Sequence, residues 1–187
     1  WDGKIRLFDT RKKTLYCGLL QYLKEFCDVR GYKIKSPEVR ALDIAHLTQT
    51  RALEAYTKKL GLSVNGVGIT PRDYQLDALS CALSDEKRLL LSPTASGKSL
   101  IIYLAIRFIL EHYDGQILLI VPTTSLVEQI YNDFGDYSAK DSWSHEETCH
   151  RIYSGRERFG VQQRVIISTW QSVYKLDRKF FVDYDLV

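Results

Sequence analysis

From residue 71 onward, short apolar runs alternate with longer stretches whose apolar positions recur every three or four residues. The first pattern is typical of buried strands and the second of amphipathic helices. We expect strands at 88–92, 116–121, 150–153 and 164–168, and a last strand beginning at 184. We expect helices at 71–84, 98–113, 125–134 and 171–174. Apolar strands separated by helices indicate a parallel sheet flanked by helices, so the predicted fold class is α/β.

The first section of the chain has a mixed pattern. Residues 4–8 alternate polar and apolar side chains, and residues 14–16 can pair with them in an antiparallel hairpin. Two helices are expected next, and each ends at a glycine, which favours helix C-termini. Residues 63–68 have the composition of a linker. We therefore predict a small α+β accessory domain at 1–64, which we regard as a DNA-binding candidate, and an α/β domain at 65–187.

The 187-residue chain is 45% hydrophobic with a net charge of +3, so it can form a core and is only mildly basic. That charge permits contact with nucleic acid without arguing for it. The four cysteines lack metal-site spacing, which favours reduced thiols in a cytoplasmic protein. We find no signal peptide and no apolar run of membrane-spanning length, and we expect a monomer without a membrane partner. Since the chain lacks methionine and begins at Trp1, we expect a piece of a longer protein.

The clearest chemistry lies at 92–100, where an apolar run opens into small residues and a helical pattern follows. A strand, a small-residue loop and a helix start form the layout of a phosphate-binding P-loop, whose backbone N–H groups hold phosphate oxygens. Lys98 adds a positive charge, and the Ser99 hydroxyl is placed to ligate Mg²⁺, so these are the candidate catalytic residues. The candidate nucleotide-binding residues of the loop are Pro93, Thr94, Ala95, Ser96, Gly97, Lys98, Ser99 and Leu100.

The loop departs from the general P-loop pattern at two positions. Ser92 stands where glycine is usual, six residues before the lysine, and Ala95 occupies another place where glycine is common. Both residues are small, so the loop can still close, although its backbone is less permissive than glycine would make it. The alternative interpretation is an ordinary strand-to-helix turn with an exposed lysine.

A glutamine precedes the loop on the helix expected at 71–84. The amide of Gln75 has a donor and an acceptor side by side, which is what reading the N6 and N7 edge of adenine requires. Arg72, one turn away, is a candidate contact to the base or the sugar. The alternative is a solvent-facing glutamine on an amphipathic helix, and the neighbouring P-loop favours the adenine contact.

Candidate phosphate contacts follow the strand expected at 116–121. Pro122, Thr123 and Thr124 turn the chain into the next helix. Hydroxyls and free helix N–H groups at such a turn can hold a nucleic-acid phosphate. Simple helix capping by a threonine is the alternative, and both roles are compatible.

Four segments resemble, in order and spacing, the motifs of superfamily 2 helicases, and within them the recombination helicases of T-even phages. The segments are Arg72–Gln75, Pro93–Ser99, Ile120–Gln129 and Ile167–Ser172, which look like the Q motif and motifs I, Ia and Ic. The resemblance covers nearly the whole chain and implies a RecA-like P-loop NTPase fold. It also implies an ATP-dependent helicase or translocase that uses ATP and Mg²⁺, acting on single-stranded, branched or recombination-intermediate DNA in a phage-infected bacterial cell.

The resemblance further implies which residues face nucleic acid. These are Pro122, Thr123, Thr124, Gln129, Thr169, Trp170 and Gln171. Trp170 is a candidate for base stacking or for core packing. Two basic loops, at 11–13 and 154–158, are candidates for phosphate contact or for plain solvation.

ATP hydrolysis in this class needs an acidic pair at a strand end, one residue to hold Mg²⁺ and one to activate water. Asp183 and Asp185 lie before or at the start of the last strand, so they are not candidates. We expect the 187-residue chain to bind ATP weakly at best and not to hydrolyse it. Two alternatives stay open: a motor subunit of a restriction system, and a non-enzymatic nucleic-acid-binding module with a degenerate P-loop.

Overall fold

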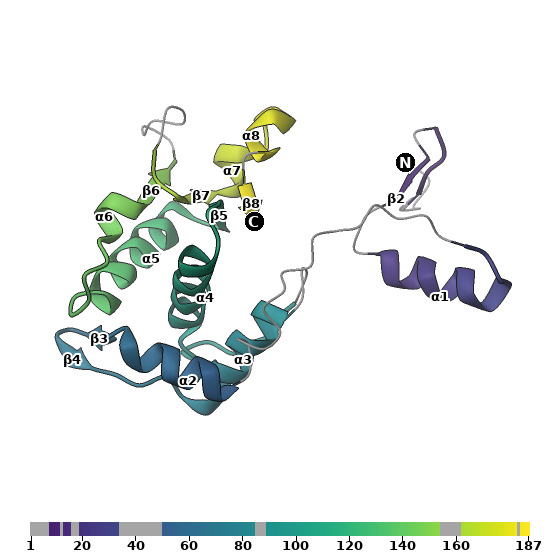
Figure 1. Cartoon of the computed structure of the whole chain (residues 1–187). Coiled ribbons are helices and arrows are strands. Elements are labelled where there is room, and N and C mark those ends of the chain that lie inside the picture. The colour runs from purple at the N-terminus through teal and green to yellow at the C-terminus, as the bar shows by residue number, and fades with distance from the viewer. Residues whose placement is uncertain are drawn as a thin grey trace. The chain divides into compact units, whose positions relative to one another are not determined.

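The computed structural model describes residues 8–11, 13–15, 19–33, 50–84, 89–153, 162–182 and 184–187. The chain divides into two compact units, Trp1–Leu42 and Asp43–Val187. Each unit is described by itself below (Figure 1).

The smaller unit contains a hairpin and a helix. Strands β1 (Phe8–Asp9) and β2 (Thr14–Leu15) pair antiparallel, as the alternating pattern predicted. Helix α1 (Leu20–Arg30) ends at Gly31, whose φ of 68° is left-handed and whose N–H donates to the Asp28 carbonyl. Glycine adopts this conformation at little cost, which is why the helix ends there.

The larger unit is built on a four-stranded parallel sheet. Its strands are β5 (Gln116–Val121), β6 (Cys149–Ile152), β7 (Val165–Thr169) and β8 (Tyr184–Leu186). They lie in the order β6-β7-β5-β8 and all three pairings are parallel. Every residue of β7 is buried, as expected for a central strand covered on both faces. The predicted α/β fold with a parallel sheet is confirmed.

Further helices accompany the sheet, and the first of them packs on the second (Figure 1). They are α3 (Asp73–Ser84), α4 (Lys98–His112), α5 (Thr124–Tyr137), α6 (His145–Thr148), α7 (Trp170–Val173) and α8 (Arg178–Val182). The pattern predicted α3, α4, α5 and α7 but missed α6 and α8. No described helix is long and apolar enough to cross a membrane.

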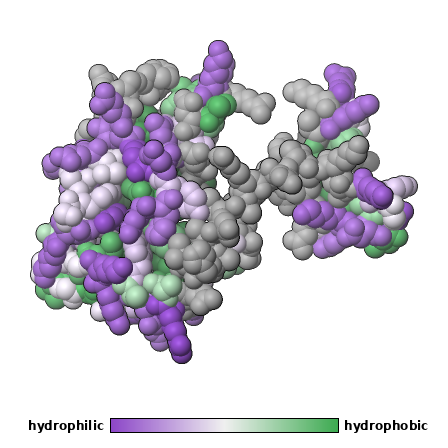
Figure 2. Space-filling view, viewed as in Figure 1, coloured by the Kyte–Doolittle hydropathy of each residue, from purple (hydrophilic) through white to green (hydrophobic). Residues whose placement is uncertain are grey.

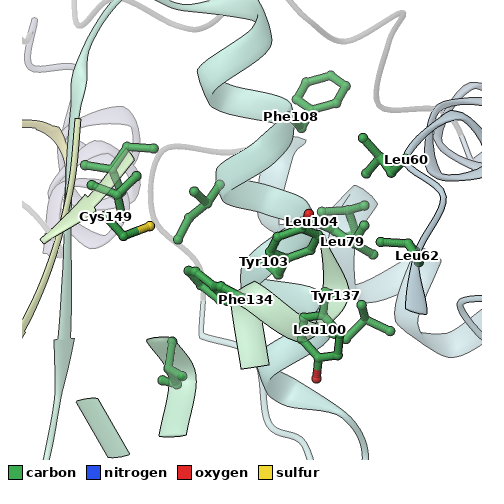
Figure 3. Close-up of a cluster of buried hydrophobic side chains, with 14 of the residues drawn as sticks. Leu60, Leu62, Leu79, Leu100, Tyr103, Leu104, Phe108, Phe134, Tyr137 and Cys149 are labelled. Carbon is green, nitrogen blue, oxygen red and sulfur yellow. The ribbon is translucent and has the colours of Figure 1, made fainter. Parts of the chain in front are cut away.

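Two apolar clusters lie on the sheet. The larger one joins Ile117 and Ile167 to α3, α4 and α5, and Figure 3 shows Tyr103 and Phe134 meeting within it. The smaller one joins Leu118 and Ile166, the alternate strand positions, to aromatic residues of α8. Because side chains alternate along a strand, these clusters occupy opposite faces. The outer surface is mixed, with apolar groups between hydrophilic ones on the face in Figure 2.

The interpretation of residues 63–68 as a linker is wrong. They form a hairpin of β3 (Ser63–Val64) and β4 (Val67–Gly68), whose turn is an Asn-Gly pair with φ of 51° and 75°. Asn-Gly is the favoured turn for two-residue hairpins, a signal that we overlooked. The hairpin is docked, because the buried Ser63 hydroxyl donates to the Asp136 carbonyl at 2.8 Å.

The larger unit also includes α2 (Thr50–Lys59), which packs on α3. Leu53 and Leu60 are buried in the same cluster as Leu79 of α3. This unit therefore begins earlier in the chain than the functional division between 64 and 65 that we predicted, and that division stays a prediction.

The strand expected at 88–92 is not formed over the residues that the structure describes. Residues 89–93 have no strand pairing, and Leu89 and Leu91 are 83% and 89% exposed. A strand requires a neighbouring backbone to satisfy its N–H and C=O groups. Among the described strands none pairs with this segment, so an apolar run alone was not enough to predict one.

Candidate nucleotide and nucleic-acid sites

The P-loop closes through its own side chains and leads into an uncapped helix. The Ser92 and Ser96 hydroxyls share a hydrogen bond of 2.5 Å. Thus the serine that replaces the usual glycine joins the two ends of the loop, a role that the sequence did not reveal. Ala95 and Gly97 have positive φ values of 61° and 78°. Helix α4 starts at Lys98 without a side-chain cap, so no capping side chain competes with an anion for the N–H groups at its start.

The Lys98 ammonium group hydrogen bonds to the backbone of the P-loop. Its Nζ donates to the carbonyl oxygens of Pro93 at 2.6 Å and Ser92 at 3.3 Å. In the described part of the chain no carboxylate pairs with it, and its side chain is exposed. The ammonium group is therefore available to a phosphate without first breaking an ion pair.

Gln75 holds the loop from α3. The side chain is 6% exposed; its Nε2 donates to the Ser96 carbonyl at 2.9 Å, and its Oε1 accepts from the Arg72 backbone N–H at 2.9 Å. The second bond is the returning half of a capping box, in which a glutamine at the third helical position bonds the N-cap. Tyr74 also donates to the Ser96 carbonyl, at 3.1 Å. Adenine reading by Gln75 and Arg72 stays a prediction beside this loop-holding role.

Ser99 shares a hydrogen bond of 2.8 Å with the hydroxyl of Tyr137 at the end of α5. Burial raises the pKa of the Tyr137 phenol, so this group stays protonated and neutral near neutral pH. Among the described residues no three His, Cys, Asp or Glu side chains converge as a metal site. A hydroxyl at a phosphate-binding helix start fits Mg²⁺ that arrives with a nucleotide, because the phosphates supply further oxygen ligands.

A second group of predicted residues gathers at one edge of the sheet. Val121 of β5 lies opposite Thr169 of β7 in the parallel register, so the segments that follow them leave the sheet together. The Thr123 hydroxyl oxygen caps α5 by accepting from the Leu126 N–H at 3.3 Å. The remaining residues predicted around this helix start are exposed: Pro122, Thr124 and Gln129.

The segment after β7 is only partly at the surface. Thr169 is 4% exposed, and its hydroxyl shares a hydrogen bond of 2.9 Å with Ser172. Trp170 and Gln171 are exposed. Thus Trp170 does not pack in the core, and the Thr169 side chain is not accessible at the surface. Its burial follows from its place at the end of a central strand, which local pattern cannot reveal.

Within the described residues, no hydrogen bond or ion pair joins this sheet edge to the P-loop. The structure thus assembles Arg72, Gln75 and residues 96–99 as one group and the predicted nucleic-acid contacts as another. The basic loop at 154–158 and Lys12 of the hairpin turn lie outside the described residues.

Replacing Gln75 with alanine separates its two proposed roles. The loss of the two hydrogen bonds made by the buried Gln75 side chain is expected to destabilise the protein by about 2 kcal/mol. If Gln75 also reads adenine, affinity falls more for ATP than for GTP, whereas a purely loop-holding role lowers both equally. Nucleotide titrations and thermal unfolding measure this, with the exposed Gln162→Ala as control. Unchanged stability and unchanged affinities would contradict both roles.

Comparison with known proteins identifies helicases as relatives of this chain. The family model for the DEAD/DEAH box helicase matches residues 72–181. The ATP-dependent DNA helicase uvsW of Enterobacteria phage T4 is 35% identical over 191 residues, an alignment that covers 100% of this chain and 36% of the relative. The chain thus spans about a third of that relative's length.

Two solved structures are similar over 98% of the chain. The crystal structure of T4 UvsW superposes with a TM-score of 0.81 at 34% identity, over 36% of that chain. A structure of the UvsW helicase from bacteriophage T4 gives a TM-score of 0.79 at 34% identity, over 64% of that chain. The resemblance to phage superfamily 2 helicases is confirmed. From residue 72 to residue 181, and therefore over more than half of its length, the chain belongs to the DEAD/DEAH box helicase family.

Proposed function

We propose that this chain is the ATP-binding part of an ATP-dependent DNA helicase or translocase that acts on branched or recombination-intermediate DNA. The observation that carries the proposal is the uncapped start of α4, beside which the Lys98 ammonium has no carboxylate partner among the described residues. The similar phage T4 protein, named an ATP-dependent DNA helicase, supports the same assignment.

The residues in and around the P-loop have separate roles in binding the nucleotide. The N–H groups at the start of α4 and the Lys98 ammonium hold phosphate oxygens, and Gln75 keeps the Ser96 carbonyl in place behind them. When bound, ATP with Mg²⁺ supplies the free energy for movement along DNA. The Ser99 hydroxyl, which shares a hydrogen bond with Tyr137, would hold the ion as one of its oxygen ligands.

DNA contact is proposed at the sheet edge. The start of α5 presents N–H groups and the Thr123 and Thr124 hydroxyls, which suit a phosphate of the DNA backbone. Trp170 and Gln171 follow the neighbouring strand at the same edge. Binding through phosphates is independent of base sequence and weakens as salt rises.

Saturable ATP binding that requires Mg²⁺ is the direct test of the nucleotide site, measured by titration calorimetry on the 187-residue chain. The proposal expects saturation. A degenerate loop, as in a non-enzymatic binding module, gives no saturable signal. Ala95 motivates this test, because a residue with a Cβ at φ 61° costs about 1 kcal/mol relative to glycine.

Thr124→Glu separates DNA contact from helix stability. A negative charge in the first turn of α5 favours the helix dipole, so stability stays the same or rises slightly. The same charge repels a DNA phosphate, and affinity for an oligonucleotide is expected to fall roughly three- to tenfold. Asn132→Glu is the matched control, because it adds the same charge to an exposed position farther along α5. Equal losses in both variants would indicate general repulsion and contradict a phosphate site at Thr124.

A further inference from the structure

Two large aromatic rings lie exposed on α7. Trp170 is 50% exposed and Tyr174, at the C-cap of the helix, is 57% exposed. Their ring centroids are 5.3 Å apart with an interplanar angle of 54°. Residues four apart on a helical turn lie on the same side, which is why the rings meet. Each ring contacts the other yet keeps about half of its surface open to solvent.

The backbone beneath these rings is firmly anchored. Val173 is buried, and Ser172 is buried and hydrogen bonded to Thr169 at the end of β7. The Tyr174 N–H donates to the Trp170 carbonyl at 2.9 Å, which closes the turn. The inner side of α7 thus provides the packing that holds the element. The exposed rings are not needed for that packing.

A positive charge accompanies the rings. The Lys175 ammonium lies 5.4 Å from the Tyr174 ring centroid and is exposed. Stacking on a nucleic-acid base requires an open aromatic face, and holding the adjoining phosphate requires a cation within a few ångströms of that face. Trp170, Tyr174 and Lys175 combine these two features on one short segment, which we call the aromatic platform.

The position of the aromatic platform favours a nucleic-acid strand over a protein segment as its binding partner. Because Val121 and Thr169 are paired in register, the platform follows β7 at the same sheet edge where the start of α5 follows β5. The hydroxyls and helix N–H groups at the start of α5 suit a phosphate. An apolar protein segment would give these groups no hydrogen-bond acceptor and would give the Lys175 ammonium no opposite charge. This edge therefore fits a nucleic-acid strand better than a protein partner.

We propose that Trp170 and Tyr174 stack on unpaired bases of a bound DNA strand, while Lys175 holds an adjoining phosphate. This inference rests on the proposed function and adds to it a base-dependent contribution. Bases in a duplex are already stacked on one another, so the platform favours single-stranded segments. Tyr174 and Lys175 are the new members of the site.

The test compares two oligonucleotides of equal length, homothymidine and a fully abasic strand, binding to the 187-residue chain. The platform predicts tighter binding of homothymidine. Trp170→Ala and Tyr174→Ala are each expected to lower homothymidine affinity by about tenfold and to leave abasic binding unchanged. Trp170→Phe keeps an aromatic face and retains most of the affinity. Lys175→Ala lowers the affinity for both strands and reduces the salt dependence by about one phosphate contact.

Val67→Ala is the control, because Val67 is an exposed apolar residue on β4, in a hairpin that contacts α5 near its C-terminal end rather than at its start. Thermal unfolding of each variant shows whether the fold is kept. Equal binding of the two strands with no effect of either alanine variant overturns the platform and leaves the proposed function standing. If neither strand binds, the proposed function and the platform fail together. If Trp170→Ala abolishes self-association in sedimentation instead, the surface is a contact with a second copy and the platform is overturned.

Discussion

Lys98→Ala is expected to lower the affinity for Mg²⁺-ATP by about a hundredfold, or to below detection. The structural reason is that Lys98 is the exposed ammonium beside the start of α4, and its present acceptors are only the carbonyls of Pro93 and Ser92. A hydrogen bond between a cation and a phosphate contributes about 1.5–3 kcal/mol, and every 1.4 kcal/mol is tenfold in affinity. Titration calorimetry with and without Mg²⁺ measures the change.

The fold should not change with this substitution. Lys98 is exposed, and exposed substitutions away from caps and ion pairs usually alter stability by less than about 0.5 kcal/mol. Lys98→Arg, which keeps the charge, should retain part of the affinity, and Lys179→Ala, at an exposed lysine of α8, should retain all of it. Undiminished ATP affinity in Lys98→Ala would remove the main support for the nucleotide site.

Gly97→Ala is expected to destabilise the protein by about 3 kcal/mol and to abolish nucleotide binding. Gly97 has a φ of 78°, and a Cβ at this position would lie 2.3 Å from the Nε2 atom of Gln75. The left-handed conformation costs about 1 kcal/mol for a residue with a Cβ. Displacing the buried Gln75 amide breaks its two hydrogen bonds, at about 1 kcal/mol each. Denaturant unfolding and ATP titration measure both effects.

Two comparisons isolate the clash. Gly66 has a similar φ of 75° with nothing within 4 Å of an added Cβ, so Gly66→Ala should cost only the conformational part, about 1 kcal/mol. In a Gln75→Ala background the clash is absent, and the cost of Gly97→Ala should also fall to about 1 kcal/mol. Equal costs for Gly97→Ala in both backgrounds would mean that Gln75 does not support the loop.

The elements that the sequence predicted well are those whose signal is local. Strand β5 was predicted at its observed bounds, and α4 to within a residue, because a run of apolar residues and a Gly-Lys start are complete signals by themselves. Gly31 ended α1 for the same reason. Each depends on backbone conformation or periodicity within a few residues.

The errors have a common cause in long-range contacts. Residues 63–68 form a hairpin held by Asp136, more than seventy positions away. Leu89 and Leu91 have strand character but no pairing strand in the described chain. Thr169 is buried because β7 is central in the sheet. For Leu89, Leu91 and Thr169 the deciding group lies far along the chain, where local pattern carries no information, whereas residues 63–68 also contained a local Asn-Gly turn signal that we overlooked.

By itself, the sequence determined most helices and most strands of the larger unit and its parallel α/β class, and it predicts phosphate binding at Lys98, since these depend on periodicity and on residue types within one short segment. Only the tertiary structure decided the order of the strands and the hydrogen bonds of Gln75 to the P-loop. It also decided that Trp170 is open to solvent while Thr169 beside it is buried. The physical reason is that burial and pairing depend on which distant side chains and backbones come together, and those contacts form only when the chain has folded.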